Sequence, residues 1–367
     1  MTLKLSDTAV IFDSGGDTVL VCDSFDYTQL IISGADSDNA LPSDYVSNYF
    51  GFTVGTHNGF TMGGWTPGQK DEIDKFYFST EADADDIADL SVARYGAAGT
   101  FSGTHGYAAG GQGGPLASEL NVIDKFPFSS EDDATDVGNL SVIRSTIQAG
   151  QSSTTHGYAS GGMEQGGFSY ANRSNVIDRF PFATDTNATD VGNLTDGRWN
   201  AAGHQSNTHG YTSGGGQGAY NEGYSYTNII DKFPFAVATA NATDVGDLID
   251  VIQGAAGQSS FTDAYRSGGI QSGYPYGPTF KFVNEIDKFP FATDTNATDT
   301  GDLQEANKNT TGFSSNVSGY TAGGNLSPSS TNYTNRIQKF PFSSAFTTAA
   351  DVADLALARG NLTGTQA

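Results

Sequence analysis

"NVIDKFPFSSEDDATDVGNL" runs from Asn121 to Leu140, and three near-copies follow it. They read "NVIDRFPFATDTNATDVGNL" from Asn175, "NIIDKFPFAVATANATDVGDL" from Asn228 and "NEIDKFPFATDTNATDTGDL" from Asn284. The shorter "IDKF" element is present six times, beginning at Ile73, Ile123, Ile177, Ile230, Ile286 and Ile337, with spacings of 50, 54, 53, 56 and 51 residues. A period of this length predicts a repeat architecture, so the repeat is interpreted before any single residue.

Each repeat is expected to form four short strands separated by Gly, Asn, Asp or Ser. Examples of the four are "AAGQSS" (255–260), "THGYASGG" (155–162), "NVIDRFPF" (175–182) and "TDVGNLT" (189–195). Only "EADADDIADLSVAR" and "AADVADLALAR" resemble amphipathic helices, and both align with the fourth strand. Four strands every 50 residues are typical of a propeller blade, so the sequence predicts an all-β chain with six blades.

A glycine doublet ends the second strand of every repeat, and we expect it to adopt positive φ where the blades converge. The doublets are Gly63-Gly64, Gly110-Gly111, Gly161-Gly162, Gly214-Gly215, Gly268-Gly269 and Gly323-Gly324. The proline of "FPF" has no amide hydrogen, which predicts an outer strand or a bulge.

The charge balance restricts the partners. The 367 residues include 41 acidic and 17 basic side chains, giving a net charge of -24. Such a surface argues against nucleic acid as a partner, since few cations are present to displace phosphate counterions. No run of about 18 apolar residues predicts a membrane span, and the N-terminus has no signal-peptide pattern. A single cysteine, Cys22, excludes an intrachain disulfide.

The doublets, the preceding tyrosines (Tyr107, Tyr158, Tyr211, Tyr265 and Tyr320) and the third-strand aromatics resemble the kelch family of β-propellers. These aromatics are Phe76, Phe126, Phe180, Phe233, Phe289 and Phe340. The kelch tryptophan of strand four is replaced by leucine, as at Leu140 and Leu194. The resemblance covers about residues 50 to 360 and implies a divergent, six-bladed kelch-like propeller, without implying an activity.

Arrays of "NVIDKFPFA", "ATDVGNL" and "THGYxSGG" also resemble structural proteins of marine phages, including cyanophages. This resemblance implies a virion location, either in a tail fibre or adsorption appendage or on the capsid surface. Residues 1–45 are interpreted as an N-terminal β attachment segment and linker that binds other virion proteins, and residues 46–367 as the propeller. The segment contains the expected strands "TAVIFDSGG", "DTVLVCDSF" and "YTQLIISG". The C-terminal "GNLTGTQA" (360–367) is expected to pair in the first blade and close the ring.

Asp and Lys of "IDK" are neighbours on a strand and are expected to point to opposite faces. We therefore predict structural inter-blade ion pairs, with Asp124 of one blade meeting Arg179 of the next. The residues involved are Asp74, Lys75, Asp124, Lys125, Asp178, Arg179, Asp231, Lys232, Asp287 and Lys288; the sixth copy has Gln338 and Lys339. The alternative is a ring of carboxylates near the axis that binds a ligand.

Four histidines, His57, His105, His156 and His209, share one position of the repeat. We interpret them as hydrogen-bonded to neighbouring backbone rather than as metal ligands, because equivalent positions of different blades lie apart. His204 is unrepeated and is expected to be exposed. The turn "ATDTNATDVGN" suggests Asx capping, with calcium at Asp185, Asn187 and Asp190 as the alternative; no other cofactor is expected.

The segments between the doublet and "IDKF" vary most and combine Tyr with Gly, Ser and Asn, a mixture typical of binding loops. The candidate binding residues are Tyr170, Tyr220, Tyr224, Tyr226, Tyr274, Tyr276 and Tyr333. Their expected ligand is a host-surface glycan or protein, or they contact a neighbouring subunit. No nucleophile elbow, zinc-protease or phosphate-loop motif is present, which predicts a non-enzymatic protein. The alternatives to a virion protein are a free carbohydrate-binding propeller, secreted or soluble outside the cell, and a glycoside-acting enzyme.

Overall fold

The computed structural model describes the backbone of residues 10–14 and 17–21, and residues 57–367 except 115–117, 166–171, 218–224, 238, 273–279, 327–331 and 344. The chain divides into two units, Met1–Tyr45 and Val46–Ala367. In the first unit, β1 (Val10–Ser14) and β2 (Asp17–Val21) pair as an antiparallel hairpin. The expected strand "YTQLIISG" lies outside the described residues.

The second unit contains six four-stranded antiparallel sheets, and its described residues form no α-helix. The first sheet has β34 (Thr363–Gln366), β3 (Asn58–Thr66), β4 (Gly68–Tyr77) and β5 (Asp85–Asp89), and the second β7 (Ala98–Phe101), β8 (His105–Ala109), β11 (Val122–Pro127) and β12 (Thr135–Asn139). The third has β14 (Gly150–Ser152), β15 (His156–Ser160), β17 (Val176–Pro181) and β18 (Thr189–Asn193), and the fourth β19 (Ala202–Gln205), β20 (His209–Ser213), β21 (Ile229–Pro234) and β22 (Thr243–Asp247). The fifth has β24 (Ala256–Ser259), β25 (Asp263–Ser267), β28 (Glu285–Pro290) and β29 (Thr298–Asp302), and the sixth β30 (Thr311–Ser314), β31 (Ser318–Ala322), β32 (Arg336–Pro341) and β33 (Ala350–Asp354).

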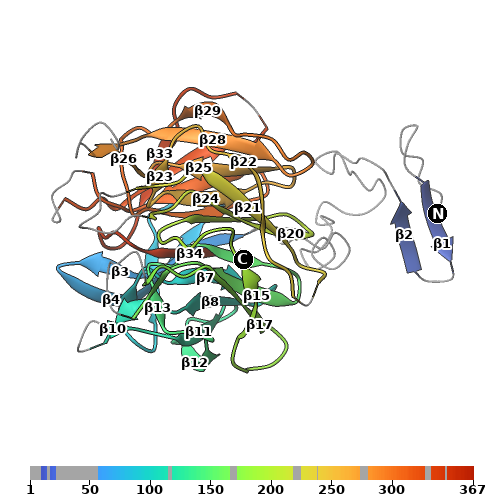
Figure 1. The fold of residues 1–367 in the computed structure, drawn as a ribbon, viewed down its shortest axis with the longest axis horizontal. Helices are drawn as coiled ribbons and strands as arrows, with labels where there is room; N and C mark the ends of the chain where they lie inside the picture. The colour runs from blue at the N-terminus through green and yellow to red at the C-terminus, as the bar shows by residue number, and fades with distance from the viewer. Residues whose placement is uncertain are drawn as a thin grey trace. The chain divides into compact units, whose positions relative to one another are not determined.

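The six sheets are arranged in a ring around their first strands. These innermost strands contact one another in a closed cycle, in the order β7, β14, β19, β24, β30, β34 and back to β7. Figure 1 shows the sheets succeeding one another through the colour series, with the last strand, β34, among the first ones. The fold is therefore all-β and β-propeller-like.

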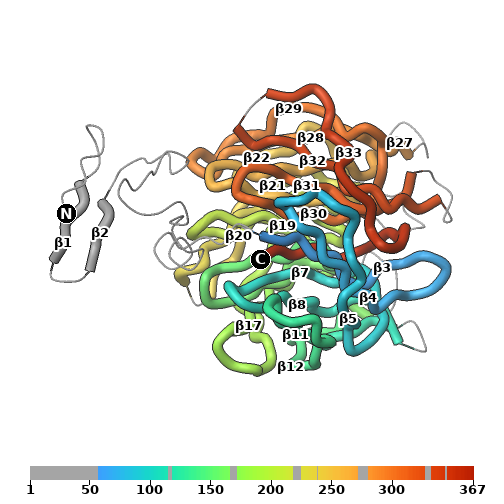
Figure 2. Tube along the Cα trace, turned by 180° about the vertical axis from the view of Figure 1, so that it is seen from behind, coloured from blue at the N-terminus to red at the C-terminus, as the bar shows by residue number. Residues whose placement is uncertain are grey.

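The C-terminus closes this ring, as the sequence predicts. Strand β34 supplies the innermost strand of the first sheet and pairs with β3 from Gly59↔Gln366 to Met62↔Thr363. Figure 2 shows the red end of the chain lying beside the blue β3. The pairing leaves neither end of the array with an unpaired inner edge.

Smaller ribbons lie where the chain passes from one sheet to the next. The ribbon strands are β6 (Arg94–Tyr95), β9 (Gln112–Gly113), β10 (Ser118–Glu119), β13 (Arg144–Ser145), β16 (Met163–Glu164), β23 (Ile252–Gln253), β26 (Ile270–Ser272) and β27 (Phe280–Phe282). In each ribbon the segment entering a sheet pairs with that sheet's own strand-two-to-three connection, as β6 does with β9. Isolated bridges such as Trp199↔Gly216 and Lys308↔Asn325 continue the pattern.

Local chemistry accounts for the shape of each sheet. All twelve doublet glycines have positive φ, as expected, and a Cβ at Gly110 would lie 2.9 Å from the Arg144 carbonyl. The expectation that the "FPF" proline lies on an outer strand or at a bulge is wrong, because it is the last residue of the third strand, an inner strand of its sheet. At a strand end a missing donor costs least. In the bulge beside Ile123 and Asp124 the extra residue is Val137 of β12, and β11 itself pairs regularly with β8. Ile123 and Asp124 are therefore buried on opposite faces of the sheet, while Lys125 stays half-exposed. Both segments that resembled helices form strands, β5 and β33.

No helix among the described residues is long and apolar enough to span a membrane.

Candidate functional site

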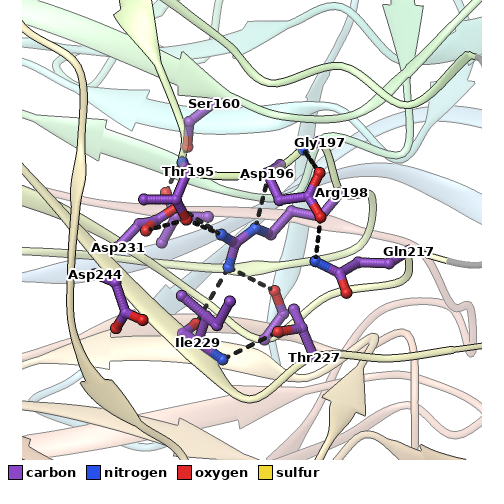
Figure 3. Close-up of polar contacts among 12 residues, drawn as sticks. Ser160, Thr195, Asp196, Gly197, Arg198, Gln217, Thr227, Ile229, Asp231 and Asp244 are labelled. Carbon is purple, nitrogen blue, oxygen red and sulfur yellow. Dashed lines mark hydrogen bonds and ion pairs between the residues drawn. The ribbon is translucent and has the colours of Figure 1, made fainter.

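The carboxylate of "IDK" is buried, and its partner is an arginine from the segment that enters the same sheet. Figure 3 shows this for Arg198 and Asp231. Arg198 Nη2 donates to Asp231 Oδ2 at 2.5 Å, and its Nη1 donates to the Ile229 carbonyl at 3.2 Å. The Arg198 carbonyl in turn accepts from the Gly162 amide of the preceding sheet at 2.7 Å. The arginine therefore joins two neighbouring sheets.

The expected pairing of Asp124 with Arg179 is wrong, since Asp124 pairs with Arg94. Arg179 lies opposite Tyr158 on the neighbouring strand of its own sheet. Asp124 lies on the face of its sheet that packs against the preceding sheet, where Ser91 and the entering Arg94 lie, whereas Arg179 belongs to the following sheet. The buried pairs are Arg359–Asp74, Arg94–Asp124, Arg144–Asp178, Arg198–Asp231 and Arg266–Asp287.

Two sheets depart from the pattern, and both departures preserve charge balance. In the fifth sheet Ile252 takes the position that the entering arginine has in the other sheets. Arg266 of β25 supplies the guanidinium instead and donates to the carbonyls of Gly268 and Glu285. In the sixth sheet both charges are absent, and Gln338 Oε1 accepts from the Gln304 amide at 2.7 Å. The entering residue there is Asn307, whose Nδ2 donates to the Gly323 carbonyl at 3.5 Å, so two neutral residues replace the ion pair. Buried charges therefore occur only in pairs at these positions.

Burial raises the pKa of the Asp74 and Asp287 carboxyl groups, and the facing guanidinium opposes that shift. Burial also lowers the pKa of Arg144 and Arg198. Each carboxylate also accepts a hydrogen bond from a backbone amide of the preceding sheet, as Asp231 does from the Thr195 amide at 3.0 Å. These carboxylates hold the ring together and do not line the axial cavity.

The lysines of "IDK" pair across sheets, but with acids of the next sheet's turn. Lys125 lies 2.9 Å from Asp185, Lys232 lies 2.8 Å from Asp294, and Lys339 pairs with Glu81. Lys75 lies over the Tyr77 ring, and Lys288 is half-buried opposite Tyr265. These contacts are more exposed than the arginine pairs and contribute less to stability.

The calcium alternative places three oxygens in the turn that contains Asp185, and each has a donor. Asp185 accepts from Lys125, Asn187 Oδ1 accepts from the Asn139 amide of the preceding sheet, and Asp190 Oδ1 accepts from the Gly192 amide. Within the described ranges, no group of three or more His, Cys, Asp or Glu is placed to hold a metal ion. The turn therefore connects neighbouring sheets, with Asn187, Asn241 and Asn296 in equivalent roles.

A ring of aromatic contacts between sheets was not predicted. Tyr107 of the second sheet stacks on Phe182 of the third with centroids 5.0 Å apart, and Tyr158 stacks on Phe235 of the fourth at 4.8 Å. The same contact joins Tyr211 to Phe291, Tyr265 to Phe342, Tyr320 to Phe78 and Phe60 to Phe128. The repeated tyrosine and "FPF" motifs therefore complete a cycle of six interfaces.

The repeated histidines hydrogen-bond a side chain rather than the expected backbone. His105, His156 and His209 each accept or donate at Nδ1 with the hydroxyl of the preceding threonine, at 2.8 Å in every case. Burial lowers the pKa of all three rings. His57, at the entry to β3, has its amide bonded to the Ala367 carbonyl.

The expectation that His204 is exposed is wrong, because only 1% of it is accessible. It lies in the middle of innermost strand β19, where other sheets place Gln151 and Gln258. Its Nε2 lies 2.8 Å from Ser213 Oγ. Burial lowers its pKa to about 4. Because the other repeats have no histidine at this position, only an alignment of the six innermost strands would have indicated that His204 is buried.

His204→Gln is expected to remove a pH dependence of stability. The folded pKa of about 4 lies below the unfolded value, so the unfolded chain binds the proton first and stability falls as pH drops below about 6.5. Between pH 7 and pH 5 the wild type should lose about 2 kcal/mol more than the variant. Urea unfolding at both pH values measures this; an equal loss in His204→Gln and wild type would contradict it, and His209→Gln is the half-exposed control.

Of the seven candidate tyrosines, Tyr226 and Tyr333 are described; Tyr170, Tyr220, Tyr224, Tyr274 and Tyr276 lie outside the described residues. Tyr226 is buried, bridges Gly216 and accepts from Gln253 Nε2 at 3.0 Å. Its ring stacks on Phe280. Tyr333 is half-buried opposite Asn325, and burial raises its pKa. Both tyrosines support the base of a variable loop.

The axis of the ring is built from glycine. The six glycines, one per innermost strand, are Gly99, Gly150, Gly203, Gly257, Gly312 and Gly364. A Cβ on any of them would lie 2.0–2.4 Å from the carbonyl oxygen of the next glycine round the ring. No side chain fits at this level, so only glycine allows the strands to approach so closely.

Two further rings of hydrogen bonds lie along the axis. Two positions after each glycine, the Ser152 amide donates to Gln205 Oε1 at 2.8 Å and the Gln205 amide to Ser259 Oγ at 3.0 Å. The series continues through Ser314 and Gln366 and is interrupted at Phe101, which has no acceptor. Before each glycine, backbone bonds link Gly96, Asn361, Asn309, Gly254, Asn200 and Thr146 in sequence.

A cavity of about 60 Å³ lies at this axis, lined by all six glycines. Its described lining contains Gln148, Gln205, Thr310 and Gln366 and no Asp, Glu, Lys, Arg or His. Gln148 arises from one extra residue: six positions separate Arg144 from Gly150, whereas five separate Arg198 from Gly203. The cavity is formed by segments from every repeat, so no single motif predicts it.

Comparison with known proteins supports the fold alone. The sequence matches no model of a known protein family and no curated protein. Among solved structures the chain is similar to the structure of YjhT, with a TM-score of 0.63 and 13% identity, over 82% of this chain and 99% of that chain. At this identity the likeness indicates a shared β-propeller-like architecture and carries no function.

Proposed function

We propose that this chain is a six-bladed kelch-like propeller that serves as a non-enzymatic structural protein of a phage particle. Each four-stranded sheet is one blade, and residues 1–45 attach the propeller to other virion proteins. The variable loops bind a host-surface glycan or protein. On the particle it forms part of a tail fibre or adsorption appendage, or it lies on the capsid surface.

The observation that supports a scaffold role is the use of the repeated polar residues. The "IDK" carboxylates bind arginines, the turn asparagines bind neighbouring amides, and the histidines bind threonines. The repeated chemistry is thus committed to contacts within and between sheets. Sequence variation is concentrated in the strand-two-to-three connections, whose bases the ribbons hold. A rigid base with variable loops suits display.

Mass spectrometry and cryo-electron microscopy of purified phage particles test this proposal. The expected result is this chain in the particle, with the propeller attached through residues 1–45. Its absence from particles, with the protein free in the lysate, would contradict the virion role.

The second candidate is a free carbohydrate-binding propeller, and Phe280 favours it. This ring borders a variable loop, is 40% exposed and stacks on Tyr226 with centroids 6.2 Å apart. Exposed aromatic faces beside Gly- and Ser-rich loops are typical of recognition sites. Phe280→Ala should weaken binding on a glycan array, whereas Val317→Ala, a 55% exposed residue away from the loops, should not; equal binding by both variants and the wild type would reject this candidate.

A further inference from the structure

The axial cavity contains polar groups that the protein itself does not satisfy. Thr310 is 2% exposed, and its Oγ1 has no hydrogen-bond partner among the described residues. The Oε1 and Nε2 atoms of Gln148 are also buried and have no hydrogen-bond partner among the described residues. Buried polar groups without a partner are destabilising and rare in folded proteins, so these groups require an explanation. Both residues line the cavity.

Two glutamines add oriented donors to the wall. Gln205 Oε1 accepts the Ser152 amide at 2.8 Å, and Gln366 Oε1 accepts the Ser314 amide at 2.7 Å. These bonds commit the oxygen of each carboxamide and leave its NH2 group as a donor at the cavity wall. Gln258 differs, because its Nε2 is bonded to Ser267, Tyr320 and Thr321.

The wall selects the class of occupant. It presents N–H donors from Gln205 and Gln366, an acceptor and a donor from Gln148, and the hydroxyl of Thr310. A hydroxyl group both donates and accepts, and so satisfies such a mixture. An ion is disfavoured, because no charged side chain lines the cavity. Phe101 supplies one apolar wall for carbon atoms.

The size of the cavity limits the ligand. At ~10–15 Å³ per water, about 60 Å³ accommodates about four to six water-sized groups. The upper figure matches the heavy atoms of a three-carbon polyol such as glycerol, or the terminal hydroxylated arm of a larger sugar. We propose that the axial cavity is a binding site for a small neutral polyol, held by Gln148, Gln205, Thr310 and Gln366. The site is separate from the variable loops and does not rest on a virion role.

The test uses glycerol and erythritol as probes on the full chain, with propan-1-ol as the apolar comparison. Saturation-transfer NMR titrations should show saturable binding of at least one polyol and weaker binding of propan-1-ol. Gln148→Gly and Thr310→Val should each weaken polyol binding at least fivefold. Gln148→Gly keeps the fold, because Gln148 has φ +48 and glycine adopts this conformation without strain.

Thr100→Val is the matched control. Thr100 is fully buried in β7, its Oγ1 is also unpartnered, and it does not line the cavity. The polyol affinity of the Thr100→Val variant should equal that of the wild type. The proposal is overturned if no probe saturates, if all three variants bind alike, or if a crystal structure of the soaked protein shows only water in the cavity. Thermal unfolding without ligand identifies any variant that fails to fold, and the other variant then decides.

Discussion

Asp231→Asn is expected to lower the free energy of unfolding by about 3–5 kcal/mol. The change leaves the fully buried Arg198 guanidinium without a counter-charge, in an interface where water cannot replace it. Asparagine is also a weaker hydrogen-bond acceptor than aspartate for the Thr195 amide and hydroxyl. These two hydrogen bonds join the third and fourth sheets. Equilibrium urea unfolding at pH 7 measures the loss.

The chain itself supplies the rescue. Asn307 and Gln338 occupy the equivalent positions of the sixth sheet without charges. The double variant Arg198→Asn/Asp231→Gln should therefore recover at least half of the stability that Asp231→Gln loses on its own, because no buried charge remains unpaired. Asp294→Asn is the exposed control, since it removes the Lys232 partner at a carboxylate that is 54% exposed, and should cost less than about 1 kcal/mol. A cost for Asp231→Asn no larger than that of Asp294→Asn would contradict the prediction.

Gly203→Ala is expected to destabilise the protein by about 4 kcal/mol or more. The new Cβ would lie 2.4 Å from the Gly150 carbonyl oxygen, and the obstructing atom is backbone. Relief requires two innermost strands to separate. That movement would disturb the cavity and the hydrogen bonds at Gln205, on both sides of the interface. The measurement is the urea midpoint together with the thermal transition.

Gly103→Ala is the matched control for this prediction. A Cβ at Gly103 meets nothing within 4 Å, and the residue is not among those with positive φ. Its stability should change by less than about 1 kcal/mol, because the new methyl group meets no other atom. If Gly203→Ala were as well tolerated as Gly103→Ala, the close approach of the innermost strands would be wrong.

The repeat by itself determined the elements. The period near 50 residues, the positive φ of the doublets and the pairing of the C-terminal segment in the first sheet follow from local pattern, and the structure agrees. Strand alternation also placed Ile and Asp of "IDKF" on opposite faces of the sheet, and neighbouring sheets cover both faces. These features depend on residues close in sequence or on the side-chain alternation of strands.

Partners across sheets were decided only by the tertiary structure. Whether Asp124 meets Arg94 or Arg179 depends on which face of its sheet packs against the preceding sheet, and no single repeat contains that information. The packing of neighbouring sheets also brings Tyr107 onto Phe182 and buries His204. The axial cavity requires the closed ring, because its wall is assembled from six segments that are distant in sequence. Contacts of this kind depend on ring closure, and a pattern that repeats along the chain describes one sheet at a time.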